Sequence, residues 1–208
     1  MLDLYGPARK APKGDVLSAL VETILSQNTT DINSLAAFQS LRKRYPTWEG
    51  ARRAGPAGIE EQIRRGGLAR TKSMRIHELL EDLKHRYGRC DLERLRELDT
   101  EQVIQELLSI KGVGPKTALV VALFEMGRPV FPMDTHVHRV LSRLGITDGD
   151  RSRLETHREI EALVAGGRLF DLHLHLIRFG RSICKPRPLC GECPLSAFCD
   201  YFEDRRAG

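Results

Sequence analysis

Residues 110–118 read Ile-Lys-Gly-Val-Gly-Pro-Lys-Thr-Ala, a tight turn between two helical patterns. Before the turn, Asp99 can cap a helix. Gln102 lies three residues later, where its side chain can accept a hydrogen bond from the backbone N–H of Asp99. After it, Pro115 occupies a position where a helix tolerates a missing N–H. Apolar residues at helical spacing follow each of these two helix starts, so the stretch predicts two helices joined by a Gly-Val-Gly hairpin.

Helical periodicity recurs along the rest of the chain. No run of alternating strand residues and no Asn-Gly or Asp-Gly turn predicts a β-hairpin. We therefore predict an all-α fold. The expected helices cover residues 14–27, 31–44, 57–64, 71–87, 100–110, 115–126, 134–145, 152–165 and 168–181.

The composition is that of an ordinary globular protein with a basic balance. The 208 residues suit one domain or two small lobes, and the formal charge of +5 favours a polyanionic partner, although many basic proteins have none. Two clusters of basic residues stand out, but a charge run is usually a solvated face. They are Arg42, Lys43, Arg44, Arg52 and Arg53, and then Arg64, Arg65, Arg70, Lys72 and Arg75.

Nothing in the sequence predicts a membrane protein. No apolar stretch approaches the roughly 20 residues that span a bilayer, and the first ten residues lack the pattern of a secretory signal. We expect a cytoplasmic protein without a membrane partner.

The hairpin carries a chemical prediction of its own. Gly112, Val113 and Gly114 lead into a helix N-terminus, where free backbone N–H groups and the helix dipole can hold an anion such as a DNA phosphate. Such a contact would position the protein on any duplex. A plain helix–helix connection, with glycine used for steric reasons, explains the same residues.

Four cysteines near the C-terminus predict a metal centre. Cys184, Cys190, Cys193 and Cys199 are spaced C-x5-C-x2-C-x5-C, which suits the four thiolates of a [4Fe-4S] cluster. Structural zinc is the alternative, although its sites more often contain two C-x2-C pairs. Cys90 is isolated and reads as an ordinary thiol.

The hairpin run, followed by Met133-Asp134-Thr135-His136-Val137-His138-Arg139-Val140, resembles the signature of the helix-hairpin-helix DNA glycosylases. With the cysteines, the chain is similar to the endonuclease III family over about residues 14–202. The resemblance implies two helical lobes. A six-helix barrel lobe with the hairpin would cover residues 16–127, and residues 1–15 plus 128–208 would form a lobe that bears the iron–sulfur loop.

The resemblance implies catalytic roles for two residues. Lys116 matches the lysine that attacks C1′ of the damaged nucleotide, and Asp134 matches the aspartate that supports positive charge on the sugar. Taken alone, Lys116 reads as a surface lysine and Asp134 as a helix cap. Lys111 replaces the family's usual proline and should add a charge near the phosphate, while His136 reads as structural.

Other residues would contact DNA by the same resemblance. Asn28 and Leu68 match the two wedge loops that fill the gap left by an extruded base, and Lys185 and Arg187 keep the basic character of the cysteine loop. Alternatively, Asn28 caps a helix and Leu68 joins the core. The first two cysteines are separated by five residues, whereas the family has six. We therefore expect the shape of this loop to differ from that in the family.

Together these features predict a monomeric, bifunctional DNA glycosylase and AP lyase with a [4Fe-4S] cluster. It would bind duplex DNA containing damaged bases or abasic sites, remove oxidised pyrimidines and cleave the strand by β-elimination through a Schiff base on Lys116. A mismatch-directed glycosylase for uracil, thymine or adenine is an alternative, and Lys116 argues against its base-removing-only forms. A non-catalytic, metal-stabilised DNA-binding module is a second alternative.

Overall fold

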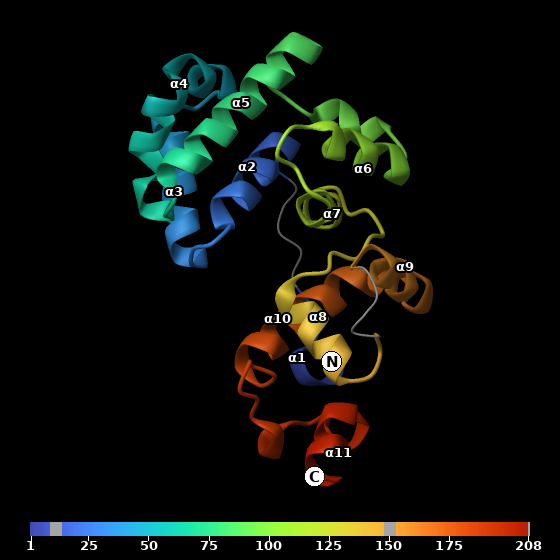
Figure 1. Cartoon of the computed structure of the whole chain (residues 1–208). Coiled ribbons are helices and arrows are strands. Elements are labelled where there is room, and N and C mark those ends of the chain that lie inside the picture. The colour runs from blue at the N-terminus through green and yellow to red at the C-terminus, as the bar shows by residue number, and fades with distance from the viewer. Residues whose placement is uncertain (9–13, 148–152, 208) are drawn as a thin grey trace. The chain divides into compact units, whose positions relative to one another are not determined.

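The computed structural model describes residues 1–8, 14–147 and 153–207. Those residues contain helices and no strand, which confirms the all-α prediction (Figure 1). The α-helices are α1 (Leu2–Tyr5), α2 (Val16–Ser26), α3 (Asp31–Arg44), α4 (Trp48–Ile63), α5 (Ala69–Tyr87), α6 (Thr100–Ser109), α7 (Pro115–Phe124), α8 (Thr135–Arg143), α9 (Arg153–Leu163), α10 (Leu169–Ser182) and α11 (Asp200–Ala207). The 3-10 helices are η1 (Arg64–Gly66), η2 (Glu93–Glu97), η3 (Gly166–Arg168), η4 (Cys190–Glu192) and η5 (Ser196–Phe198).

The chain forms two compact units. Unit 1 combines Met1–Ala11 with Gly127–Gly208, and unit 2 is Pro12–Met126. Helices α2 to α7 belong to unit 2, whereas α1 and α8 to α11 belong to unit 1. Within the described ranges, no helix is long and apolar enough to cross a membrane.

Unit 2 is built around α2, whose apolar face is fully enclosed. Val16, Leu17, Leu20 and Val21 are all buried, and α2 packs against α3, α5 and α7. Side-chain caps explain where its helices begin, because each cap satisfies an otherwise unpaired backbone N–H. The caps of α2, α3 and α4 are Asp15, Thr30 and Thr47, and Asp99 and Gln102 form the predicted capping box of α6.

One helix of unit 2 is longer than the sequence predicted. The expected helix at 57–64 is the second half of α4, which already begins at Trp48 and bends at Gly55, where φ is +69°. The prediction missed residues 48–56 because glycine and proline there lower helix propensity. Thr47 was the local signal for the true start, since its hydroxyl accepts from the N–H of Gly50 at 3.2 Å.

Unit 1 is organised by the contact between α8 and α10. Gly180 permits their close approach, because a Cβ there would lie 3.0 Å from Cβ of His136. The short helix α1 packs on α10, and the N–H of Ala8 donates to Asp171 at 3.1 Å. The predicted start of α9 at residue 152 lies outside the described residues. Helices α1 and α11 were not predicted, and the polar sequence of α11 offers no apolar stripe.

Candidate active site and cysteine pocket

The hairpin between α6 and α7 presents its backbone to open space. Gly112 has φ of +84°, and neither it nor Gly114 has any neighbour within 4 Å of the position of an added Cβ. Val113 alone points inward and is buried, with its N–H bonded to the carbonyl of Ile110 at 3.1 Å. No side chain among the described residues caps α7. Its first N–H groups therefore remain available to an anion.

Lys116 is the second residue of α7 and is exposed. The prediction placed a lysine at the positive end of a helix, and the structure has it there. Its side chain is therefore open to solvent in the structure. Lys111 forms an ion pair with Glu78 at 3.1 Å, so its charge is partly neutralised.

Asp134 is the N-cap of α8, as the sequence predicted. It is only 8% exposed, and its Oδ1 accepts from the N–H groups of His136 at 2.8 Å and Val137 at 2.7 Å. Both bonds reach the same oxygen, and Oδ2 receives none from the residues that the structure describes. The cap therefore uses one oxygen of the carboxylate. His136 makes the structural contact that was expected, 3.0 Å from Nη2 of Arg139.

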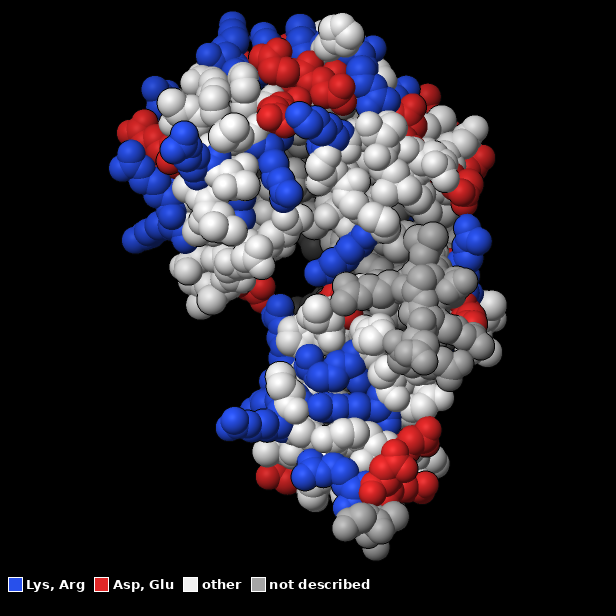
Figure 2. Space-filling view, in the orientation of Figure 1, with Lys and Arg blue, Asp and Glu red and all other residues white. Residues whose placement is uncertain are grey.

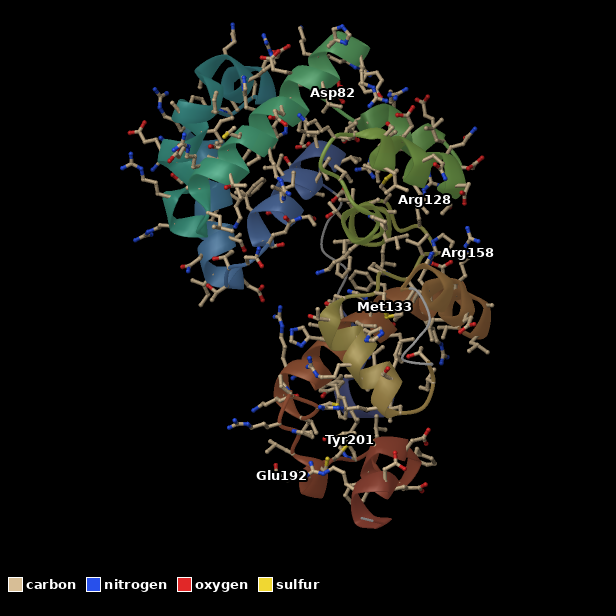
Figure 3. All side chains as sticks on the ribbon, viewed as in Figure 1. Asp82, Arg128, Met133, Arg158, Glu192 and Tyr201 are labelled. Atoms are coloured by element: carbon tan, nitrogen blue, oxygen red, sulfur yellow. The ribbon has the colours of Figure 1, made fainter. Side chains whose placement is uncertain are left out.

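The segment before Asp134 is anchored in the interior of unit 1 and runs between the labelled residues Arg128 and Met133 (Figure 3). Phe131 is 0% exposed, its N–H donates to Oε1 of Glu161 on α9 at 2.6 Å, and its ring meets the edge of His173. Burial raises the pKa of Glu161. The sequence pattern did not single out Glu161, because its partner is thirty residues away and depends on the packing of α9.

The two predicted wedge residues share an unusual backbone conformation. Asn28 has φ of +53° and Leu68 has φ of +49°, and no other non-glycine residue in the described part of the chain has a positive φ. Asn28 does not cap α3, because Thr30 does, and Leu68 is 58% exposed and so not part of the core. Both structural alternatives are therefore wrong, and both side chains lie at exposed loop positions.

The wedge loops also lie beside each other. A Cβ on Gly67 would be 3.9 Å from the carbonyl oxygen of Asn28 and 4.0 Å from Oγ1 of Thr29. Beneath them, Lys72 is buried, although the sequence placed it in a solvated basic cluster. That expectation was wrong because Lys72 faces backbone carbonyls of unit 2, which composition cannot reveal. Figure 2 shows other basic side chains spread over α3 and α4, with acidic ones among them.

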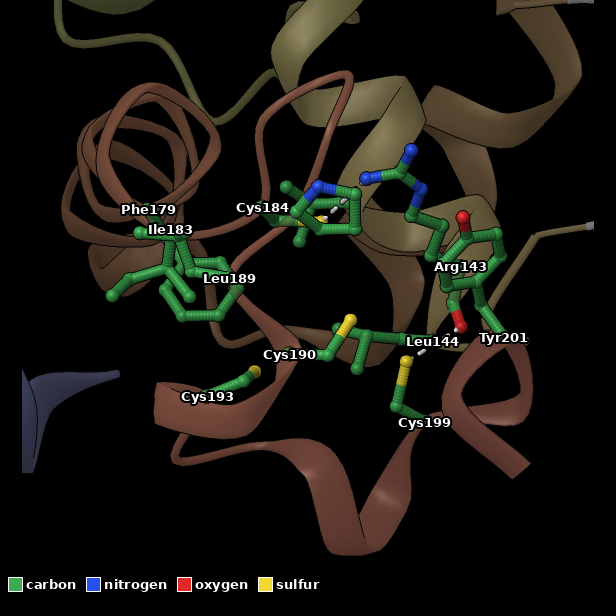
Figure 4. A pocket seen from close by; sticks show the side chains of 12 residues that line it. Arg143, Leu144, Phe179, Ile183, Cys184, Leu189, Cys190, Cys193, Cys199 and Tyr201 are labelled. Carbon is green, nitrogen blue, oxygen red and sulfur yellow. Dashed lines mark hydrogen bonds between the residues drawn. The ribbon is translucent and has the colours of Figure 1, made fainter. Parts of the chain in front are cut away.

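The four cysteines line one pocket in unit 1 (Figure 4). Apolar side chains from α8, α10 and the cysteine loop form the rest of the wall, with Arg143 and Tyr201. Burial raises the pKa of the Cys193 thiol, and the three other cysteines add to the rise. Thiolates gathered in this way need positive charge beside them.

Arg143 supplies one such charge and ties down the shortened loop. Its guanidinium donates to Sγ of Cys184 at 3.4 Å, to the carbonyl of Lys185 at 2.7 Å and to that of Pro186 at 3.0 Å. The guanidinium also lies 4.6 Å from the ring centroid of Tyr201. The thiol of Cys199 donates to the backbone carbonyl of Arg143 at 3.1 Å. The five-residue gap is thus a defined loop in which Lys185 is exposed, as is Arg187.

The four cysteines line this pocket without being drawn together into a metal-binding group. In the described stretches, no three His, Cys, Asp or Glu side chains come close enough together to hold a single metal ion. Cys90, as expected, stands apart and is buried, and burial raises the pKa of its thiol to about 11.

Comparison with known proteins agrees with this arrangement. Residues 21–165 match the HhH-GPD superfamily of base excision DNA repair proteins. Endonuclease III of Thermotoga maritima is 34% identical over 201 residues, which cover 96% of this chain and 90% of that protein.

Solved structures show the same likeness. A trapped endonuclease III–DNA covalent intermediate superimposes with a TM-score of 0.83 at 29% identity, covering 99% of this chain and 93% of the other. A thermostable thymine-DNA glycosylase gives 0.78 at 25% identity, covering 91% and 85%. The protein is therefore a base excision repair DNA glycosylase that belongs to the endonuclease III family of the helix-hairpin-helix superfamily.

Proposed function

We propose that the protein removes oxidised pyrimidines from duplex DNA and cleaves the strand with Lys116 as the nucleophile. The observation that carries this proposal is the position of Lys116, exposed in the first turn of α7 directly after a hairpin whose backbone can hold a phosphate. A phosphate bound at Gly112 to Gly114 would bring the adjacent sugar toward the lysine. The similar endonuclease III structure is named as a covalent intermediate with DNA, which supports a nucleophilic mechanism.

The proposed step conserves atoms and charge. The neutral amine of Lys116 forms a bond to C1′ as the bond from C1′ to the base breaks, and the base leaves with the electron pair and takes up a proton. Loss of a proton from the nitrogen, with opening of the sugar ring, gives a Schiff base. Removal of a 2′ proton then expels the 3′ phosphate, and water releases the product from the lysine.

Asp134 would assist this step by stabilising charge. A carboxylate with one free oxygen can stabilise the positive charge that develops on the sugar as the base departs. Its backbone hydrogen bonds fix the direction of the carboxylate.

The cysteine pocket fits a [4Fe-4S] cluster by its donor set, and we propose that Cys184, Cys190, Cys193 and Cys199 hold it. All four sulfurs border one apolar space, and Arg143 is at hand to balance the negative charge of the thiolates. Such a cluster would supply structural order rather than bond-breaking chemistry. The loop that it orders carries Lys185 and Arg187, which we expect to contact the DNA backbone.

Borohydride trapping tests the nucleophile directly, because it reduces a Schiff base to a stable amine. We expect the wild type to form a covalent adduct on a duplex with thymine glycol or an abasic site, and Lys116→Ala to form none. Lys43→Ala, which removes an exposed lysine from α3, is the matched control and should trap normally. An undiminished adduct with Lys116→Ala would rule out the proposed nucleophile.

A second candidate is a thymine glycosylase directed to mismatches. It is favoured by the likeness to the thermostable thymine-DNA glycosylase. The two activities separate on matched duplexes that contain either thymine glycol opposite adenine or thymine opposite guanine. Faster base release from the mismatch, without a trapped adduct, would replace the first proposal with the second.

A further inference from the structure

Lys72, in the first turn of α5, is a buried lysine whose side chain is hydrogen-bonded to the ends of two other helices. Only 3% of the surface of this residue is exposed to solvent. Nζ donates to the carbonyl of Leu25 at 2.7 Å and to the carbonyl of Gly66 at 2.7 Å. Leu25 lies in the last turn of α2, three residues before Asn28, and Gly66 ends η1, two residues before Leu68.

The two acceptors suit a positive charge. The last carbonyls of a helix have no partner within the helix and form the negative end of its dipole, so a cation beside Leu25 is favoured there. Burial opposes the charge and lowers the pKa of Lys72. A desolvated ammonium is stabilised by its hydrogen bonds, and removal of the side chain would leave two buried carbonyls unsatisfied.

The loops that Lys72 joins need such support. Asn28 and Leu68 adopt the left-handed conformation, which is unfavourable in a non-glycine residue and persists only where the surroundings hold it. Gly67 lies against the backbone of Asn28, and Arg75, also from α5, donates to Oε1 of Gln27 at 3.1 Å. Helix α5 thus supports both loops from one side.

We propose that Lys72 is a positioning residue that sets the spacing of Asn28 and Leu68, so that both enter the duplex together when a base is extruded. This inference rests on the wedge roles within the proposed function. It assigns to Lys72 no contact with DNA and no part in the chemistry at C1′. Loss of the clamp should therefore slow the steps that open the duplex and leave the reaction of Lys116 intact.

Two substrates separate these effects. In a lesion-containing duplex the damaged base must be extruded, whereas a single strand with a preformed abasic site needs no opening. For Lys72→Met we expect single-turnover base release from the duplex to fall about 10- to 100-fold, as for a misplacement of about 1 Å. Borohydride trapping on the abasic single strand should stay at the wild-type rate. Lys72→Arg keeps the charge and the donors and should recover part of the loss.

A matched control and a spectroscopic signal complete the test. Lys84→Met makes the same change on the same helix, away from the wedge loops, and should leave both substrates unaffected. Fluorescence of 2-aminopurine opposite the lesion reports unstacking, and its rise on binding should be smaller for Lys72→Met than for the wild type. Equal losses on both substrates, or no loss on either, would overturn the positioning role.

If Lys72→Met fails to fold, Gly67→Ala decides. Gly67 is exposed and has φ of +66°, a conformation that strains any residue with a Cβ, so Gly67→Ala strains the backbone beside Leu68 without touching the buried lysine. We expect the same selective loss of base release, and normal base release in this variant would refute the coupling of the loops. Failure of the wild type to trap on abasic DNA would instead count against the proposed function, so the two failures are distinguishable.

Discussion

At the scale of single residues, the candidate site follows rules that act within one helical turn. Asp134 lies where a polar side chain can bond the N–H groups two and three residues ahead, and Lys116 follows a proline at a helix start. Neither position requires long-range contacts. The capping of Asp134 and its proposed electrostatic role use different oxygens, and they can be separated by substitution.

Asp134→Asn should keep the cap and lose the charge. Asparagine caps helices about as well as aspartate, so we expect a small change in the melting temperature, while base release falls by about 10²- to 10³-fold. Asp134→Ala should lose the cap as well and destabilise the protein by about 1 kcal/mol. Thermal unfolding and single-turnover kinetics on the same two proteins check both statements. Equal activity of Asp134→Asn and the wild type would contradict the electrostatic role.

At the scale of elements, α8 connects the candidate catalytic aspartate of unit 1 with its cysteine loop. Asp134 caps its start, and Arg143 in its last turn binds the cysteine loop. Arg139, between them, donates to the carbonyls of Gly180 and Cys184, so the helix is bonded to the end of α10 as well. One short helix therefore fixes both the aspartate and the frame of the pocket.

Arg143→Met should loosen the cysteine loop without changing the four cysteines. It removes the hydrogen bonds to Sγ of Cys184 and to the carbonyls of Lys185 and Pro186, together with the contact with Tyr201. We expect the purified protein to lose visible absorbance and iron to a chelator faster than the wild type. Arg178→Met, on α10, is the control. Unchanged iron retention would show that the loop does not depend on Arg143.

At the scale of the whole molecule, the two units differ in their buried histidines. Burial lowers the pKa of His136, His157 and His175, all of which lie in unit 1. A lowered pKa means that the unfolded state binds protons more readily than the folded state just below pH 6.5, so folding stability falls as the pH falls through that value. Glu161 opposes this trend, because its raised pKa lets the folded state take up a proton first.

Because three histidines with a lowered pKa outnumber the one glutamate with a raised pKa, we predict that unit 1 loses more stability than unit 2 as the pH falls. Between about pH 7.5 and about pH 5.5, the free energy of opening should fall more for peptides from residues 135–182 than for peptides from residues 31–87. Hydrogen exchange, corrected for the intrinsic effect of pH, measures both in one sample. His157→Gln should reduce the difference, and an equal response of the two units would contradict the prediction.

The amino-acid sequence alone determined what depends on neighbours in the chain. The capping box at Asp99, the hairpin of glycines and proline, and the cap at Asp134 all act over three or four residues, and each was predicted and is present. The kinked start of α4 and the polar α11 were missed, because glycine and proline or the lack of an apolar stripe hid them from local patterns.

Only the tertiary structure decided what depends on partners far along the chain. It buried Lys72 under carbonyls from two loops, gave Glu161 the N–H of Phe131, and left Leu68 exposed where a core position was possible. A basic cluster in the sequence is equally compatible with a solvated face and with a buried clamp. Which one forms depends on whether unpaired carbonyls lie within reach, and that is a property of packing.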